Sequence, residues 1–147
     1  MHERAKRLGI PSYTFATKEF IEGKKIIELL VSNKINGLVL AGFLLRISEP
    51  ILELFPNKII NIHPALLPKY GGKGMYGMHV HEAVKLANES ETGITIHYVN
   101  EHYDEGNVIF QATCTVLSSD TPEDVAHKVQ RLEHKYFPQI VEQVFSK

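Results

Sequence analysis

The sequence predicts an α/β domain with a Rossmann-like, mostly parallel sheet, followed by an antiparallel strand pair and a long C-terminal helix. In the first half, apolar runs of strand length alternate with segments of helical periodicity, as in βαβ units. In the second half, two runs rich in β-formers are separated only by residues 100–107. That segment is too short for a helical crossover, which indicates an antiparallel pair.

The first residues are expected to be helical. Residues 1–8 favour a short helix that Gly9 ends. Thr17 can cap a longer helix that reaches about Asn33. The apolar side of that helix is expected to be Phe20, Ile27, Leu30 and Val31.

Strands and helices then alternate. The continuous apolar run 38–41 is typical of a strand buried on both faces of a parallel sheet. Ser48 is expected to cap a short helix with Pro50 in its first turn. Further along, the patterns predict a strand at 58–63, a loop rich in Pro and Gly at 64–78, a helix at 79–88, and strands at 92–99 and 108–117.

The last helix has the clearest start signal. Thr121 is a good N-cap, Pro122 suits the first helical position, and Asp124 supplies an acid at N3. A kink is expected at Pro138. One apolar stripe is expected to consist of Val125, Val129, Leu132, Tyr136 and Ile140.

Composition excludes several classes of function. The 147 residues carry 16 Lys and Arg against 17 Asp and Glu, a formal net charge of -1. Proteins that work on nucleic acid or anionic membranes usually carry a clear basic excess, so we expect neither as a partner. The single cysteine, Cys114, argues against a disulfide framework. With no apolar run of transmembrane length and no signal-peptide pattern, we expect a cytoplasmic protein.

Two motifs carry weak signals. Residues 72–77 fit G-x-G-x-x-G, but no strand directly precedes them, so a loop over a site is favoured over dinucleotide binding. His79 and His81 could form a metal pair with His63 or His102. Residues i and i+2 do not share a helix face, and no Cys or carboxylate has zinc-motif spacing. We expect no metal and interpret this pair as solvated surface histidines.

The segment Asn61-Ile62-His63-Pro64 carries the strongest local signal. In a strand, Asn61 and His63 point to the same side, while Ile62 faces into packing. Pro64 keeps His63 extended to the carboxyl end of the strand, where open α/β sheets bind ligands. By spacing alone, a strand-end histidine with a purely structural role stays an alternative. Asp104, in the segment between the last two strands, means little in isolation, because turns collect such residues.

Taken together, three segments resemble the folate-dependent formyltransferases: 61–70 (NIHPALLPKY), 93–99 (GITIHYV) and 103–109 (YDEGNVI). A fourth, 132–138 (LEHKYFP), narrows the resemblance to the branch that formylates glycinamide ribonucleotide (GAR) in purine synthesis. The likeness runs from about Arg4 to the C-terminal helix, so we expect one formyltransferase domain over 1–147. It implies transfer of a formyl group from 10-formyltetrahydrofolate, a cosubstrate rather than a bound cofactor, to the amino group of GAR.

The resemblance also implies which residues are functional. It implies that Asn61, His63 and Asp104 form the catalytic set. Folate contacts are expected from Leu44, Leu45, Arg46, Ile47, Asn61, His97, Asn100, Glu101, His102, Tyr103 and Asp104. GAR contacts are expected from Gly42, Ile62, Gln130 and Glu133. The chemistry suits these groups: Asn61 and a protonated His63 can stabilise an oxyanion, and Asp104 near His63 would favour the imidazolium.

The chain departs from the family pattern at its start. The family begins with a βαβ unit whose loop cradles the GAR phosphate, and this sequence begins in the following helix. We therefore expect weak GAR binding and treat an inactive folate-binding fragment as an alternative. A second alternative is 10-formyltetrahydrofolate deformylase, whereas methionyl-tRNA formyltransferase would need a tRNA-binding domain. The oligomeric state is expected to be monomer or homodimer.

Overall fold

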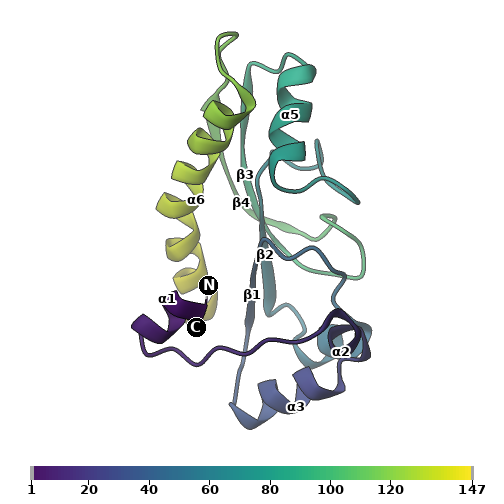
Figure 1. Ribbon diagram of the computed structural model, residues 1–147. Coiled ribbons are helices and arrows are strands. Elements are labelled where there is room, and N and C mark those ends of the chain that lie inside the picture. The colour runs from purple at the N-terminus through teal and green to yellow at the C-terminus, as the bar shows by residue number, and fades with distance from the viewer. Residues whose placement is uncertain (1, 147) are drawn as a thin grey trace. The chain divides into compact units, whose positions relative to one another are not determined.

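The computed structural model describes residues 2–146, and the chain divides into two compact units, one up to Lys34 and one from Ile35 onward. The first unit holds three short helices: α1 (His2–Arg7), α2 (Thr17–Glu22) and α3 (Lys24–Ser32) (Figure 1). The helix predicted from Thr17 to Asn33 is thus two helices. Gly23 divides them, because its backbone is left-handed, with φ of 72°.

The predicted details of that segment also need correction. The N-cap of α2 is Ala16, not Thr17, and the Glu19 carboxylate accepts the Ala16 N–H at 3.0 Å. Ile26 is the buried residue of α3, whereas Val31 is exposed. The predicted apolar side was based on one unbroken helix. The break at Gly23 changes which residues share a helix face.

The second unit is built on a four-stranded sheet in the order β1-β2-β3-β4 (Figure 1). Its strands are β1 (Leu38–Ala41), β2 (Ile59–His63), β3 (Glu91–Tyr98) and β4 (Val108–Thr115). β1 and β2 are parallel, and β3 and β4 form the predicted antiparallel pair. β3 also pairs antiparallel with β2, so the described sheet is mixed rather than mostly parallel. The connection through residues 64–90 contains a helix, yet it returns the chain in the opposite direction.

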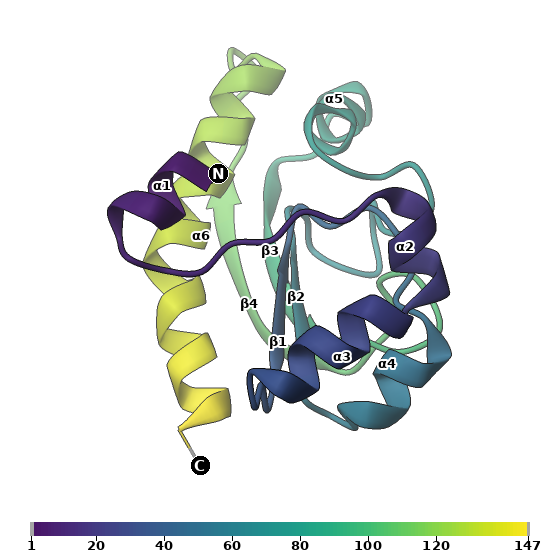
Figure 2. The same ribbon diagram turned by 60° about the horizontal axis from the view of Figure 1, so that its bottom comes forward.

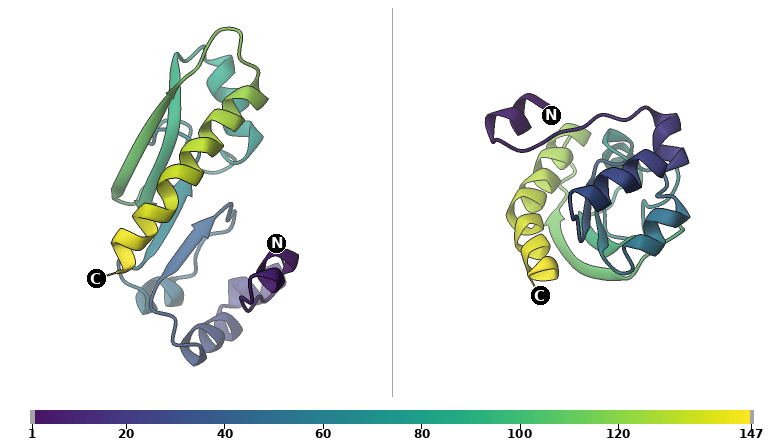
Figure 3. Two further views of the ribbon diagram at one scale, coloured as in Figure 1. Left: turned by 90° about the vertical axis from the view of Figure 1, so that its left-hand side faces the viewer. Right: turned by 90° about the horizontal axis from the view of Figure 1, so that it is seen from below.

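Three helices accompany this sheet: α4 (Glu49–Leu54), α5 (Met78–Leu86) and α6 (Pro122–Phe145). α6 runs along one face of the sheet, and α4 lies on the other side (Figures 2 and 3).

The start of α6 is as predicted: Thr121 accepts the Asp124 N–H at 3.2 Å, and Asp124 accepts the Thr121 N–H at 2.9 Å. The helix continues through Pro138. None of the helices in residues 2–146 is long and apolar enough to cross a membrane.

The hydrophobic core lies between the sheet and the two longest helices of this unit, α5 and α6. Ile60 and Ile62 of β2 and Ile94 and Ile96 of β3 are buried together. Val84 of α5, Val116 just after β4, and Val125 and Val129 of α6 complete this buried cluster. The rest of the predicted stripe of α6 packs against it, so that prediction is confirmed. Because side chains alternate along a strand, Asn61, His63, Thr95 and His97 are left for the opposite face.

β1 differs from its prediction. It was expected to be buried on both faces, but its burial alternates, and Val39 is 43% exposed. The reason is its place at the edge of the described sheet, where one side has no neighbouring strand. An apolar run alone does not reveal whether a strand is central or lateral.

Candidate active site

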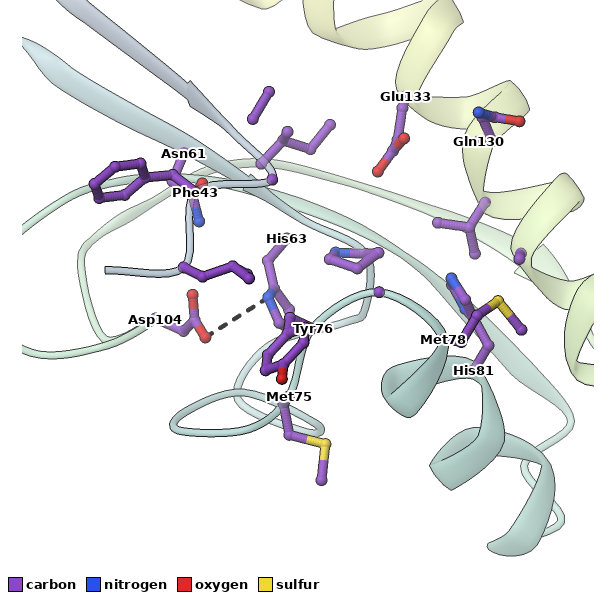
Figure 4. A pocket seen from close by; sticks show the side chains of 18 of the residues that line it. Phe43, Asn61, His63, Met75, Tyr76, Met78, His81, Asp104, Gln130 and Glu133 are labelled. Atoms are coloured by element: carbon purple, nitrogen blue, oxygen red, sulfur yellow. Dashed lines mark ion pairs between the residues drawn. The ribbon is translucent and has the colours of Figure 1, made fainter. Parts of the chain in front are cut away.

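The candidate catalytic side chains lie near the carboxyl ends of β1 and β2, where the sequence predicts a ligand site (Figure 4). The register of β2 and β3 places Asn61 opposite His97 and His63 opposite Thr95. These four side chains therefore share one face of the sheet. Asn61 Nδ2 lies 3.2 Å from His97 Nε2, and His97 Nδ1 lies 2.8 Å from the Tyr98 carbonyl oxygen. The carbonyl can only accept, so His97 Nδ1 donates to it, and His97 Nε2 faces both the Asn61 amide and the Asp104 carboxylate.

The loop after β2 is held against the sheet by Thr95. Its hydroxyl donates to the Ala65 carbonyl at 2.7 Å and accepts the Leu67 N–H at 3.0 Å. Gln111 of β4 donates to the same hydroxyl at 2.8 Å. With the first residues of this loop held in place, the Tyr70 carbonyl lies 2.7 Å from His63 Nε2, which donates to it. In its neutral form, His63 then keeps a free lone pair on Nδ1.

Asp104 completes the cluster from the turn between β3 and β4. Its oxygens lie 3.6 Å from His63 Nδ1 and 3.5 Å from His97 Nε2. The Gly72 N–H donates to Asp104 at 2.9 Å. Asp104 has a left-handed backbone, with φ of 57°, a conformation that Asp tolerates better than most residues. A register shift between Ile96 and His97 lies on β3 shortly before this turn, and the pairing continues past it to Tyr98 and Asn107.

Burial decides the protonation of His63. The side chain is buried, and burial lowers its pKa below the usual value although Asp104 and the Tyr70 carbonyl act to raise it. The expectation that Asp104 keeps His63 protonated near neutral pH is therefore wrong. Burial also acts to raise the pKa of Asp104, but the contacts with His97 and the Gly72 N–H outweigh it and hold that pKa below its usual range. The resting site thus combines a carboxylate with a neutral imidazole.

A cavity of about 970 Å³ opens beside this cluster. It is within the size range of small-molecule sites. Asn61, His63 and Asp104 line it, as do all four residues expected to contact GAR: Gly42, Ile62, Gln130 and Glu133. Figure 4 shows the Glu133 carboxylate pointing from α6 toward the side on which His63 lies, with Gln130 on the same helix. Burial raises the pKa of Glu133, while His134 opposes that effect.

A second, smaller cavity of about 50 Å³ lies next to the first. It is lined by the residues expected to contact folate, except Leu44, which lines the large cavity. That lining includes Leu45, Arg46, Ile47, Asn61, His97, Asn100, Glu101, His102, Tyr103 and Asp104. The Arg46 guanidinium donates to the Glu101 carbonyl and so joins the two segments that form the walls. Asn61, Asp104, Phe43 and Tyr103 line both cavities and stand where the two meet.

Several lining residues were not anticipated. Phe43 lies between Gly42 and Leu44 and lines both cavities. The glycine-rich loop contributes Met75 and Tyr76 to the large cavity, in line with the prediction of a loop over a site. His81 also lines it and is only 6% exposed, so the interpretation as a solvated surface histidine is wrong for His81 and holds for His79. Nothing in the sequence next to His81 marked it as buried.

No group of three or more His, Cys, Asp or Glu side chains within residues 2–146 is arranged to hold a metal ion. The histidines do not converge as ligands would. His81 is buried on α5, while His79 on the same helix is exposed and faces Glu82 at 3.6 Å. His63 and His97 point their nitrogens at backbone carbonyls, Asn61 and Asp104.

The buried His81 predicts an acid sensitivity of folding. Burial, aided by His63, lowers the pKa of His81, and its Nδ1 has no hydrogen-bond partner. The unfolded chain binds this proton near pH 6.5, so stability is full above that value and falls as the pH drops below it. We expect the melting temperature to fall less steeply between about pH 7.5 and about pH 5.5 in His81→Gln than in the native chain. Thermal denaturation followed by circular dichroism measures this.

The matched control is His79→Gln, which changes an exposed histidine two positions earlier on the same helix. Its pH dependence should follow that of the native chain. An equally steep fall in His81→Gln and the native chain would show that His81 does not contribute to the acid sensitivity.

Comparisons with known proteins agree with the geometry. A family model described as formyl transferase matches residues 1–141. The chain is 40% identical over 144 residues to a chloroplastic phosphoribosylglycinamide formyltransferase of Arabidopsis thaliana, covering 95% of this chain and 49% of that protein. It is 37% identical over 147 residues to the phosphoribosylglycinamide formyltransferase of Bacillus subtilis, covering 97% of this chain and 72% of that protein.

Solved structures give the same result. The phosphoribosylglycinamide formyltransferase of Streptococcus pneumoniae superimposes with a TM-score of 0.87 at 33% identity, covering 98% of this chain and 79% of that one. The chain spans about half the length of the plant relatives that it matches.

Proposed function

Because this chain belongs to the formyl transferase family, we propose that it transfers a formyl group from 10-formyltetrahydrofolate to the amino group of GAR in purine synthesis. One observation carries the proposal: Asn61 and Asp104 line both cavities, with His63 beside them. A transfer between two substrates needs its reacting groups where the two binding sites meet. The formyl transfer reaction is inferred from the relatives named above, and its location is inferred from the place where the two cavities meet.

The proposed reaction joins the GAR amine to the formyl carbon and then breaks the bond from that carbon to the folate nitrogen. The Asn61 amide is a donor for the oxyanion that forms on the formyl oxygen. Neutral His63 takes the proton that the attacking amine loses, on the free lone pair of Nδ1. Asp104, 3.6 Å from that atom, stabilises the imidazolium that results. The proton then passes to the departing folate nitrogen, and His63 is neutral again.

This sequence of steps assigns His63 a different resting state from the one expected at first. A buried neutral imidazole is a competent base, whereas a histidine already protonated could only donate. The low pKa of Asp104 keeps its carboxylate charged throughout. The hydrogen bond from His63 Nε2 to the Tyr70 carbonyl selects the tautomer in which Nδ1 is free.

We propose that GAR occupies the large cavity and that Glu133 binds a hydroxyl or amino group of it. Replacing Glu133 with alanine should raise the KM for GAR by about 10–100-fold, the usual effect of losing a hydrogen bond to a charged group. The KM for the folate should change little. Steady-state kinetics with each substrate varied in turn measures both values.

The matched control for that variant is Glu142→Ala, which removes an exposed acid from the same helix, away from the cavity. A KM for GAR that is equal in Glu133→Ala and Glu142→Ala would contradict the role of Glu133.

We propose that the folate binds across the small cavity. At about 50 Å³ this space is too small for a pterin ring, because sites for molecules of that size occupy roughly 300–1,000 Å³. The segments 44–47 and 100–104 must therefore move apart on binding, and the Arg46 contact with the Glu101 carbonyl must lengthen or break.

The proposed transferase and its two alternatives, a deformylase and a folate-binding fragment, differ in where they leave the formyl group. With isotope-labelled 10-formyltetrahydrofolate and GAR, a transferase moves the label to GAR, and a deformylase releases it as formate. A folate-binding fragment retains the label on the folate. We propose measuring all three for this chain and for a version extended by the family's first βαβ unit. Formate as the main product in both versions would overturn the proposed function.

Further properties stay predictions. We propose that GAR and the formyl folate are the partners of the chain and that it is a monomer or a homodimer. A cytoplasmic location also stays a prediction, since one relative bears the description chloroplastic.

A further inference from the structure

We propose that Glu89 is a positioning residue for His63 and that it acts through Tyr70. The proposal rests on the function proposed above and extends it to a residue that lines neither cavity. Glu89 lies between α5 and β3, 26 positions after His63 in the numbering of the chain. The link between them is a pair of hydrogen bonds made by the two ends of one tyrosine.

The first bond joins the Tyr70 side chain to Glu89. The Tyr70 hydroxyl donates to Glu89 Oε1 at 2.9 Å, and Lys69 Nζ donates to the same oxygen at 2.8 Å. The Tyr70 ring packs against the hydrophobic core cluster. These contacts hold the tyrosine at both its hydroxyl and its ring, which leaves little freedom for its backbone.

The second bond joins the Tyr70 backbone to His63. The Tyr70 carbonyl accepts from His63 Nε2 at 2.7 Å. Tyr70 adopts a left-handed backbone, with φ of 56°, which is uncommon for a bulky residue. Such a conformation persists only when its surroundings hold it in place. The bond to Glu89 is one of the restraints that keep the carbonyl directed at the imidazole.

The backbone of Glu89 is held in place by hydrogen bonds at the end of α5. Its N–H bonds to the Val84 carbonyl at 3.3 Å, and the Asn88 N–H bonds to the Lys85 carbonyl at 3.0 Å. Asn88 is left-handed, with φ of 52°, so the end of α5 forms a Schellman motif. The Glu89 backbone is therefore tied to the helix, and the helix is packed in the core through Val84.

The consequence concerns the tautomer of His63. While the Tyr70 carbonyl accepts from Nε2, the neutral ring carries its proton on that atom and offers Nδ1 as the base. If Tyr70 turns away, the proton can move to Nδ1, where the Asp104 carboxylate would accept it. The base would then face away from the attacking amine. The charged or titratable groups around His63 are Asp104, His97 and, from α5, His81.

The test compares four variants by NMR of the imidazole nitrogens and by kinetics. Glu89→Ala and Tyr70→Phe each remove the side-chain bond, Glu89→Gln retains an oxygen that the Tyr70 hydroxyl can use, and Lys69→Met removes only the lysine. Nitrogen chemical shifts report the fraction of His63 that carries its proton on Nε2. This readout does not depend on turnover, and a purely structural role of Glu89 would not move it.

We expect Glu89→Ala and Tyr70→Phe to lower the Nε2-protonated fraction of His63 and to reduce kcat by about tenfold, typical of losing a residue that orients a functional histidine. The KM for GAR should stay within about twofold, and Glu89→Gln and Lys69→Met should resemble the native chain. An unchanged tautomer in Glu89→Ala would overturn the proposal. A changed tautomer in Glu89→Ala, together with no formyl transfer by the native chain, would support the positioning role and contradict the proposed function.

Discussion

Replacing Asp104 with asparagine is expected to lower the rate of formyl transfer by about 10²–10⁴-fold. The amide has nearly the shape of the carboxylate but not its charge, so the imidazolium of His63 loses its stabilising partner. His63→Ala should cost as much, because it removes the base itself. Binding of the folate should survive largely in both variants. Single-turnover kinetics together with calorimetric titration of the folate separate the two effects.

The matched control is Glu105→Gln, which neutralises the next acid in the same turn but lines neither cavity. Its rate should stay close to that of the native chain. Because Asp104 acts through His63, the double variant should be scarcely slower than either single one. Native turnover in Asp104→Asn or His63→Ala would refute the assignment of these residues.

Replacing Gly106 with alanine is expected to destabilise the fold by about 1–3 kcal/mol and to disable the site. A Cβ at this position would lie 1.6 Å from the Tyr98 carbonyl oxygen and 3.5 Å from His97 Nδ1. The turn that carries Asp104 must therefore move away from β3. Urea denaturation measures the loss of stability, and the transfer assay measures the loss of activity.

The neighbouring substitution Glu105→Ala is the control for that experiment. Glu105 is exposed, so its loss should change the free energy of unfolding by no more than about 0.5 kcal/mol. If Gly106→Ala matched Glu105→Ala in both stability and activity, the close approach of Gly106 to Tyr98 would not matter for the site.

Local patterns predicted the parts of the fold that local physics determines. The capping box of Thr121 and Asp124 forms as expected, since its hydrogen bonds join residues three apart. Asn61 and His63 share a face because strand alternation requires it. The antiparallel pair β3 and β4 followed from the shortness of its connection.

Features that depend on distant contacts were not predictable in this way. His81 is buried in the folded chain although it lines the large cavity, and the positions next to it in the sequence gave no sign of its burial. β1 is half-exposed because of its place in the sheet order. The resting state of His63 depends on burial, which outweighs the neighbouring carboxylate. Tyr70 belongs to a recognisable motif, but only the fold brings its hydroxyl to Glu89.

The central claim is that Asn61, His63 and Asp104, where the two cavities meet, carry formyl transfer to GAR. The most direct test follows isotope-labelled formyl from 10-formyltetrahydrofolate in the chain extended by the family's first βαβ unit, with and without Asp104→Asn. We predict labelled formyl-GAR as the product of the extended chain and a loss of about 10²–10⁴-fold in the variant. Label released as formate, or formyl-GAR produced equally fast by the variant, would contradict the claim.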